Sequence, residues 1–358
     1  MVALDTALIT AVISQATRLA TYSWENGTLA EALLEYYNPE LSVFSANAFP
    51  NGKLPTDFTA DDVKGLAYAK HTIELDADTL TPDGSLGDPN SLGVSAVLLA
   101  VHDAAYASAA QRQNDHTLAG KTWDGAISHR ESTTELWADS EYMVPPFLAY
   151  YAVGKHDLNA LRFAARQPVK YAAKLAPERG LWQHILGKPY DQETPDDTGL
   201  WSTGNAWALA GMARVYATIK NGPFAGKLGA EMKDLRVLMK GIIDGVRSAP
   251  LADDEQGAGL VRNYIQQDQW WGEISGTSLI AAAIYRMAKL EPEMFGGDCV
   301  KWADKRRRVV WQHIGKDGIA SPAVNPLAWG DFTRFTSGSP EGQAFIIMME
   351  SAKRDLNT

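Results

Sequence analysis

The chain has 358 residues, and its 46% hydrophobic and 21% charged content is that of a globular protein with a large core. A formal net charge of −10 argues against nucleic-acid binding, which needs a basic stripe, although local groups can still bind an anionic sugar. The single cysteine excludes an intrachain disulfide and a cysteine-based metal site, and the seven histidines lack zinc-binding spacing.

Helical periodicity dominates the chain. The first predicted helix covers residues 5–21 with Asp5 as its cap, and the next covers 59–75, where Thr59 and Asp62 form a capping box. Further helices are predicted at 92–108, 133–153, 158–175, 205–219, 225–247, 277–290, 298–314 and 342–356. Short strands are predicted only near 123–127 and 259–264.

The N-terminal segment bears on the compartment. Residues 1–20 have an amphipathic pattern without the basic start and apolar block of a signal peptide. No apolar run reaches the roughly 18 residues of a membrane span, so we expect no membrane partner. A secreted protein whose signal peptide has been removed is favoured slightly over a cytoplasmic one.

The helices are separated by loops rich in Gly, Pro, Asp and Asn, and no low-complexity linker divides them. We therefore expect a single catalytic domain over residues 1–358. About twelve helices in pairs match the count of a six-hairpin α/α toroid. An α-solenoid has a similar count, but the chain lacks the self-similarity of a repeat. The long loops with Trp, Asp and His favour an all-α fold, a closed (α/α)6 barrel with its site on the loop face.

One segment places a carboxylate on an apolar helix face. In the predicted helix 133–153, Ser132 and Glu135 can form the capping box, so Asp139 is not needed as the cap. Asp139 shares a face with Met143. A carboxylate in such a place costs free energy unless it is paired or functional. The pattern leaves open a general acid and a structural Asp bonded to a neighbouring loop.

Three further segments carry candidate polar groups. Asp88 precedes a proline at a predicted helix start, which favours a helix cap over a functional carboxylate. His184 lies in a loop two residues after Trp182, where a histidine either packs in the core or holds a sugar hydroxyl. A glycine-rich segment enters the helix that carries Trp207, and its backbone N–H groups suit an anion or a hydroxyl. The alternative is an ordinary helix capped by Asn205. Residues 270–278 and 337–343 are also loops that enter helices.

In this order and spacing, the segments resemble the unsaturated rhamnogalacturonyl hydrolases of glycoside hydrolase family 105. They more distantly resemble the unsaturated glucuronyl hydrolases of family 88. The resemblance covers residues 86–350, and the Trp137-x-Asp139 segment is its most specific piece. The other matching pieces are Gly180-Leu-Trp-x-His184, Gly204-Asn205-x-Trp207 and Glu273-x-Ser275.

The resemblance implies a six-hairpin α/α barrel glycosidase that removes a terminal 4,5-unsaturated uronic acid by hydrating its C4=C5 double bond. Asp139 matches the catalytic aspartate, and Asp88 matches a second aspartate that tunes it. No metal or organic cofactor is implied. The partner is a short unsaturated oligosaccharide, and the protein is expected to be a monomer or a homodimer. The residues expected to contact the substrate are His184, Trp207, Trp137, Met143, Thr203, Asn205, His129 and Trp271.

The chain departs from the family pattern at one position. Thr203 stands where the family has an arginine that suits a carboxylate, and Ala206 replaces a glycine. The substrate carboxylate is then held by hydroxyls, by backbone N–H groups, or by His129 or Arg130. Glucuronyl and galacturonyl substrates both remain open.

Two other functions remain open as well. One is an ordinary inverting glycosidase on the same barrel, with Asp139 paired with Asp88 or Glu273. The other is a carbohydrate-binding protein that has lost the chemistry.

Overall fold

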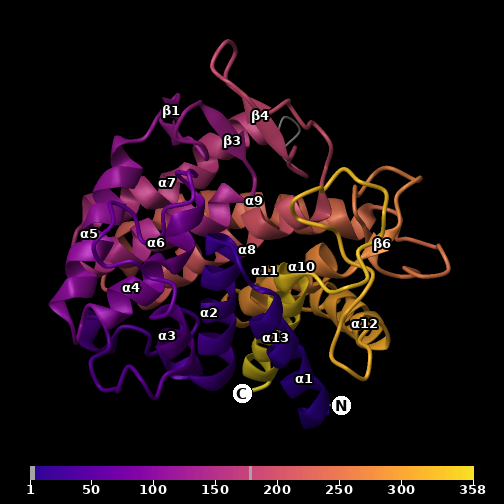
Figure 1. The fold of residues 1–358 in the computed structure, drawn as a ribbon, viewed down its shortest axis with the longest axis horizontal. Coiled ribbons are helices and arrows are strands. Elements are labelled where there is room, and N and C mark those ends of the chain that lie inside the picture. The colour runs from indigo at the N-terminus through magenta and orange to yellow at the C-terminus, as the bar shows by residue number, and fades with distance from the viewer. Residues whose placement is uncertain (1–4, 177–179) are drawn as a thin grey trace.

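The computed structural model describes residues 5–176 and 180–358, and it is mostly helical (Figure 1). The helix contacts define an inner and an outer ring. In the inner ring each helix packs against the next, and the last packs against the first. The inner helices are α2 (Ser23–Tyr37), α4 (Gly93–Leu99), α6 (Ser140–Gly154), α8 (Ser202–Asn221), α10 (Ile274–Leu290) and α13 (Pro340–Leu356). A 3-10 helix, η3 (Asp88–Leu92), precedes α4 and packs between α2 and α6.

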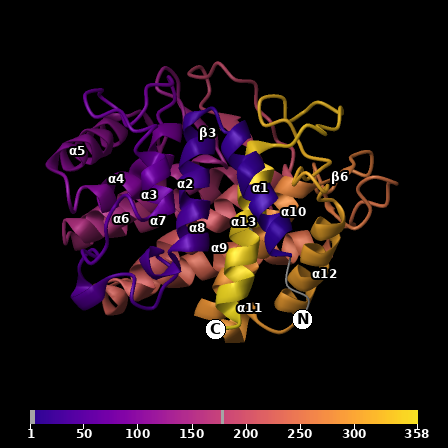
Figure 2. The same ribbon diagram turned by 60° about the horizontal axis from the view of Figure 1, so that its bottom comes forward.

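Each outer helix packs on a member of the inner ring. The outer helices are α1 (Thr6–Leu19) on α13, α3 (Lys64–Ala69) on α2, α5 (Ala104–Ala119) on α4, α7 (Leu158–Leu175) on α6, α9 (Gly229–Ser248) on α7 and α8, and α12 (Asp298–Gln312) on α10. In Figure 2, α1 lies directly against α13, so the outer helix at one end of the chain packs on the inner helix at the other end. This arrangement confirms the predicted (α/α)6 barrel.

Helices of the two rings differ in burial, as the outer helix α7 and the inner helix α2 show. The outer helix α7 buries one face, and its observed bounds are those predicted, residues 158–175. The inner helix α2 was not predicted. Its buried residues include Glu25, Glu31 and Glu35 as well as leucines and alanines, so it has no apolar stripe. A helix surrounded by protein on all sides loses the amphipathic signal.

Two predicted helices have other bounds. The capping box of Thr59 and Asp62 does not form, because the Asp62 N–H donates to the Thr59 carbonyl in a turn and α3 begins only at Lys64. The segment predicted as one helix over 92–108 is two helices, since Asp103 caps α5 through the Ala105 N–H and interrupts the run.

The predicted helix 133–153 is wrong in its first turn. Residues Glu135–Trp137 form strand β3, which pairs with β4 (Ile185–Gly187), and α6 begins only at Ser140. Glu135 makes no capping box. Its carboxylate accepts hydrogen bonds from the Thr133 hydroxyl and the Trp137 indole N–H. It also accepts the backbone N–H groups of residues 193 and 194, in the loop that follows β4. Asp139 therefore lies at the start of α6 rather than beyond its first turn.

The remaining strands are short pairs. The predicted strand region 123–127 is the hairpin of β1 (Thr122–Trp123) and β2 (Ala126–Ile127), and the region 259–264 contains β5 (Val261–Arg262), which pairs with β6 (Gly272–Glu273). The short helices are η1 (Pro39–Leu41), η2 (Pro50–Gly52), η4 (Ala225–Lys227) and α11 (Pro292–Phe295).

One apolar cluster extends from Ile9 to Ala352. This continuity supports the single-domain organisation, which stays a prediction. In the part of the chain that the structure describes, no helix has both the length and the apolar character needed to cross a bilayer.

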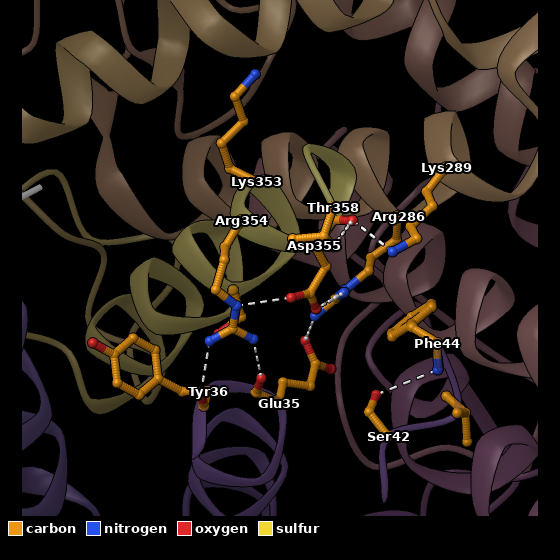
Figure 3. A network of polar contacts seen from close by, with 12 residues as sticks. Glu35, Tyr36, Ser42, Phe44, Arg286, Lys289, Lys353, Arg354, Asp355 and Thr358 are labelled. Atoms are coloured by element: carbon orange, nitrogen blue, oxygen red, sulfur yellow. Dashed lines mark hydrogen bonds and ion pairs between the residues drawn. The ribbon is translucent and has the colours of Figure 1, made fainter. Parts of the chain in front are cut away.

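A buried ionic network joins three inner helices at their C-terminal ends (Figure 3). Arg286 of α10 lies between Glu35 of α2 and Asp355 of α13, with N–O distances of 2.7 and 2.5 Å. Arg354 donates to the backbone carbonyls of Glu35 and Tyr36. The network ties the first inner helix to the last two and so helps to close the ring.

Replacing Arg286 should destabilise the barrel. The side chain of Arg286 is only 4% exposed, so Arg286→Met removes one of the two cations that contact Glu35 and Asp355, which keep Arg214 and Arg354 respectively. We expect the free energy of unfolding in urea to fall by about 1–3 kcal/mol, the cost of leaving buried polar groups without a partner. Lys301→Met is the control, because Lys301 and Asp298 form a pair that is 75% exposed on both sides, and it should cause no measurable change. Equal stability of the Arg286 variant and the wild type would contradict a role in closing the ring.

Candidate active site

The N-terminal ends of the inner helices meet around one cavity of about 280 Å³. Trp24 is the second residue of α2, Asp139 directly precedes α6, and Trp201 directly precedes α8. Asp88 begins η3, and Glu341 is the second residue of α13. The full lining is Trp24, Asp88, His129, Arg130, Trp137, Asp139, Met143, His184, Trp201, Trp207, Pro326, Leu327, Trp329 and Glu341. Because the positive ends of the helix dipoles point to this space, it favours a negatively charged ligand.

Asp139 lies on one wall of the cavity, at the end of a row of four linked side chains. His184 is fully buried, and its Nε2 lies 3.2 Å from Oδ2 of Asp139. The other ring nitrogen, Nδ1, lies 2.9 Å from Oδ2 of Asp197, which also accepts the Tyr264 hydroxyl at 2.5 Å. With its Nδ1 proton held by Asp197, the imidazole presents Nε2 to Asp139.

The carboxylates on either side of His184 favour the charged form of its imidazole ring. Burial disfavours the charged ring, but the carboxylates of Asp139 and Asp197 raise the pKa of His184 above its usual value. Burial also disfavours the charged form of Asp197, yet hydrogen bonds from His184 and Tyr264 lower its pKa. The three groups therefore act as one coupled unit that stores a proton beside Asp139.

A second wall carries Asp88. His129 Nε2 lies 3.7 Å from Oδ1 of Asp88, and the His129 ring stacks on Trp137 with 4.8 Å between centroids. Burial raises the pKa of Asp88 to about 8; the nearby Asp83 adds to the rise and Arg130 opposes it. Asp88 is therefore a neutral acid at pH 7. The preference for a helix cap is wrong here, because the Asp88 side chain accepts no capping hydrogen bond.

The lining also contains residues that were not selected from the sequence, and two of them, Glu341 and Trp329, lie against the groups described above. Glu341 accepts the Trp24 indole N–H at 2.8 Å through Oε1, and its Oε2 has no hydrogen-bond partner among the described residues. Burial raises the pKa of Glu341 well above the usual value, so its protonated form is favoured more than that of an exposed glutamate. The sequence signal was a glutamate in the first turn of an otherwise apolar helix, which normally indicates only a favourable dipole interaction.

The second such residue, Trp329, comes from a loop without any motif. Its ring contacts Trp137 at 5.4 Å and His184 at 5.1 Å between centroids. The Asn263 side chain holds this loop by donating to the Trp329 carbonyl at 2.9 Å. Trp329 thus borders the space above Asp139, although it lies 190 residues away in the chain.

The structure separates the residues expected at the site into two groups. Those that line the cavity are Asp139, Asp88, His184, Trp207, Trp137, Met143 and His129. Three others do not line it. Thr203 is buried and donates to Glu273, Asn205 bonds to the backbone of Trp182, and Trp271 donates to the Phe332 carbonyl.

Glu273 is also turned away from the cavity. It caps α10 by accepting the backbone N–H groups of Ser275 and Gly276, and it accepts the Ser202 hydroxyl at 2.8 Å. Its oxygens are therefore occupied within the fold, so it does not pair with Asp139 as a second catalytic carboxyl group.

The barrel has carboxyl groups and tryptophans around one cavity, an arrangement suited to an enzyme that acts on sugars. The family model of Glycosyl Hydrolase Family 88 matches residues 54–319. The chain therefore belongs to glycosyl hydrolase family 88. No curated protein matches the chain at a significant level.

Solved structures share the fold at low sequence identity. A possible member of the GH105 family from Salmonella enterica serovar Paratyphi A is 15% identical, with a TM-score of 0.75 over 98% of this chain and 94% of that one. A family 105 glycoside hydrolase from C. acetobutylicum is 14% identical, with a TM-score of 0.70 over 98% of both chains. An unsaturated glucuronyl hydrolase specific for heparin is 14% identical, with a TM-score of 0.66 over 98% and 96%.

The raised pKa of Asp88 should make stability depend on pH. The folded protein keeps the Asp88 proton up to about pH 8, whereas the unfolded chain loses it near pH ~4. Between these values the folded state binds more protons, so the free energy of unfolding falls as pH rises. Asp88→Asn cannot ionise, and its stability relative to wild type should increase from pH 4 to pH 8 in urea unfolding.

The control for this experiment is Asp234→Asn. Asp234 is exposed on α9, so its stability difference from wild type should not change in the same way. A flat difference for Asp88→Asn across this pH range would show that Asp88 ionises normally in the folded protein.

Proposed function

We propose that the protein releases a terminal 4,5-unsaturated uronic acid from lyase-generated oligosaccharides by hydrating its C4=C5 double bond. The observation that carries the proposal is the chain from Asp139 through His184 to Asp197 at the cavity wall. It provides one carboxyl group that can give a proton and take one back, which hydration of a double bond requires.

The reaction begins with proton transfer from Asp139 to C4 of the enol ether, which leaves positive charge at C5 and the ring oxygen. A water molecule then adds at C5, and its proton returns to Asp139. The hemiketal that results opens to a ketone and expels the neighbouring sugar. His184 stabilises the ionised form of Asp139 between the two transfers, because its charged ring lies 3.2 Å away.

Asp88, on the second wall of the cavity, binds the sugar in this proposal and takes no part in the proton transfers. Asp88 is neutral at pH 7, so it donates a hydrogen bond to a sugar hydroxyl without repelling Asp139. Trp137, Trp201 and Trp207 present aromatic faces to the apolar faces of the sugar. The helix N-termini around the cavity favour the negative charge of a uronate over a neutral sugar.

Substitution of Asp139 tests the mechanism. Asp139→Asn keeps the shape of the side chain but cannot give or take the proton, so we expect turnover to fall by about 10²- to 10⁴-fold. The measurement is the loss of enol-ether ultraviolet absorbance with rhamnogalacturonan, pectate, glucuronan and glycosaminoglycan lyase products. The substrate that reacts also distinguishes a glucuronyl from a galacturonyl specificity.

The matched control is Asp253→Asn, since Asp253 is exposed and lies outside the cavity lining. It should react like wild type. Near-wild-type turnover by Asp139→Asn would remove Asp139 from this role. Absence of absorbance loss with every lyase product, by a folded protein, would instead favour an inverting glycosidase that uses Asp88 with Asp139 or an inactive binder. Activity on saturated glycosides separates those two.

A further inference from the structure

The proposed reaction leaves one question about recognition, and the inference below rests on that proposed function. The substrate carries a carboxylate, yet three carboxyl groups, Asp88, Asp139 and Glu341, face the cavity. An anionic ligand needs a compensating cation at a defined place in such a site. The charges around the cavity show which side chain provides it.

Two of the residues considered for this task are unsuited to it. Thr203 is fully buried, and its hydroxyl donates to Glu273. His129 is also buried, and burial lowers its pKa well below the usual value, so its ring is neutral at pH 7. Gly87 covers the His129 ring so closely that a Cβ atom there would lie 2.5 Å from Nδ1.

Arg130, in contrast to Thr203 and His129, is suited to binding a carboxylate. Among the residues that the structure describes, it is the only lysine or arginine in the cavity lining. Its guanidinium carbon lies 4.5 Å from the centroid of the Trp137 ring, a distance typical of stacking. The guanidinium donates no hydrogen bond to any described residue, so its edge is free for a ligand.

The backbone around Arg130 holds the side chain in position. The Arg130 N–H donates to the Ser128 hydroxyl at 3.1 Å, and the residue forms a β-bridge with Ser85. Ser85, in turn, donates its hydroxyl to the His129 carbonyl. A guanidinium stacked on a fixed ring loses little conformational freedom when it binds a carboxylate through two parallel hydrogen bonds.

We propose that Arg130 binds the carboxylate of the terminal uronic acid and thereby selects uronides over neutral sugars. Asp88 and Glu341 repel this carboxylate less than ordinary acidic groups would, because burial raises the pKa of both. They are left to bind hydroxyl groups. Arg130 is thus the specificity-determining residue of the cavity, and Asp139 with His184 is left to the chemistry.

The first experiment compares Arg130→Gln with Arg334→Gln on a reactive lyase product. Arg334 is a matched control, since it also lies over a tryptophan, Trp271, but outside the cavity lining. Both variants lose one positive charge. Arg130→Gln should raise KM by about 10- to 100-fold with a smaller effect on kcat, and Arg334→Gln should not. Equal KM values for the two variants overturn the proposal.

The methyl ester of the same product provides a sharper test, because it removes the carboxylate charge from the substrate. Wild type should lose affinity for the ester, whereas Arg130→Gln should bind ester and acid equally. An equal loss on the ester in both proteins would show that another group holds the carboxylate.

A binding measurement separates this inference from the proposed reaction. Calorimetry with unsaturated products should show binding to Asp139→Asn and strongly weakened binding when Arg130→Gln is added. Arg130-dependent binding together with no turnover by wild type leaves Arg130 in place and removes the hydration reaction. Binding that does not depend on Arg130, or no binding to Asp139→Asn at all, overturns the proposal for Arg130.

Discussion

The parallel packing of fully buried inner helices is the constraint on which the rest of the structure depends. An inner helix such as α8 is enclosed by protein along most of its length, so it has no solvent face on which to place polar groups. Polar side chains are then stable only where they pair with one another or where a helix ends. In this barrel, polar side chains pair with one another at the C-terminal ends of the inner helices and surround a cavity at the N-terminal ends.

At the C-terminal ends, the polar groups pair. Arg286 and Arg354 meet the carboxylates and carbonyls of α2 and α13, and the cations lie where helix dipoles are negative. At the N-terminal ends, the groups surround a cavity. Burial raises the pKa of Asp88 and Glu341 there, while the carboxylates of Asp139 and Asp197 raise the pKa of His184. The same helices therefore provide stability at one end and chemistry at the other.

The protonation states of the carboxyl groups bear on which ligand the cavity can hold. Three carboxyl groups in one small space would repel an anion if all were ionised. Burial raises the pKa of two of them, and in the proposed function Arg130, a cation stacked on Trp137, holds a uronate beside Asp139. A neutral sugar would then leave the guanidinium without its partner, so the proposed contact would also discriminate between substrates.

The sequence by itself determined the barrel and half of the cavity lining. Amphipathic outer helices such as α7 follow from their periodicity, and the spacing of Trp137, Asp139 and His184 indicated the family. Only the tertiary structure decided the rest. It identified α2 as a helix, turned Thr203 and Asn205 away from the cavity, and brought Trp329 and Glu341 to it. The physical reason is that periodicity records which face of a segment is buried, whereas the partners of a buried side chain come from segments far away in the chain.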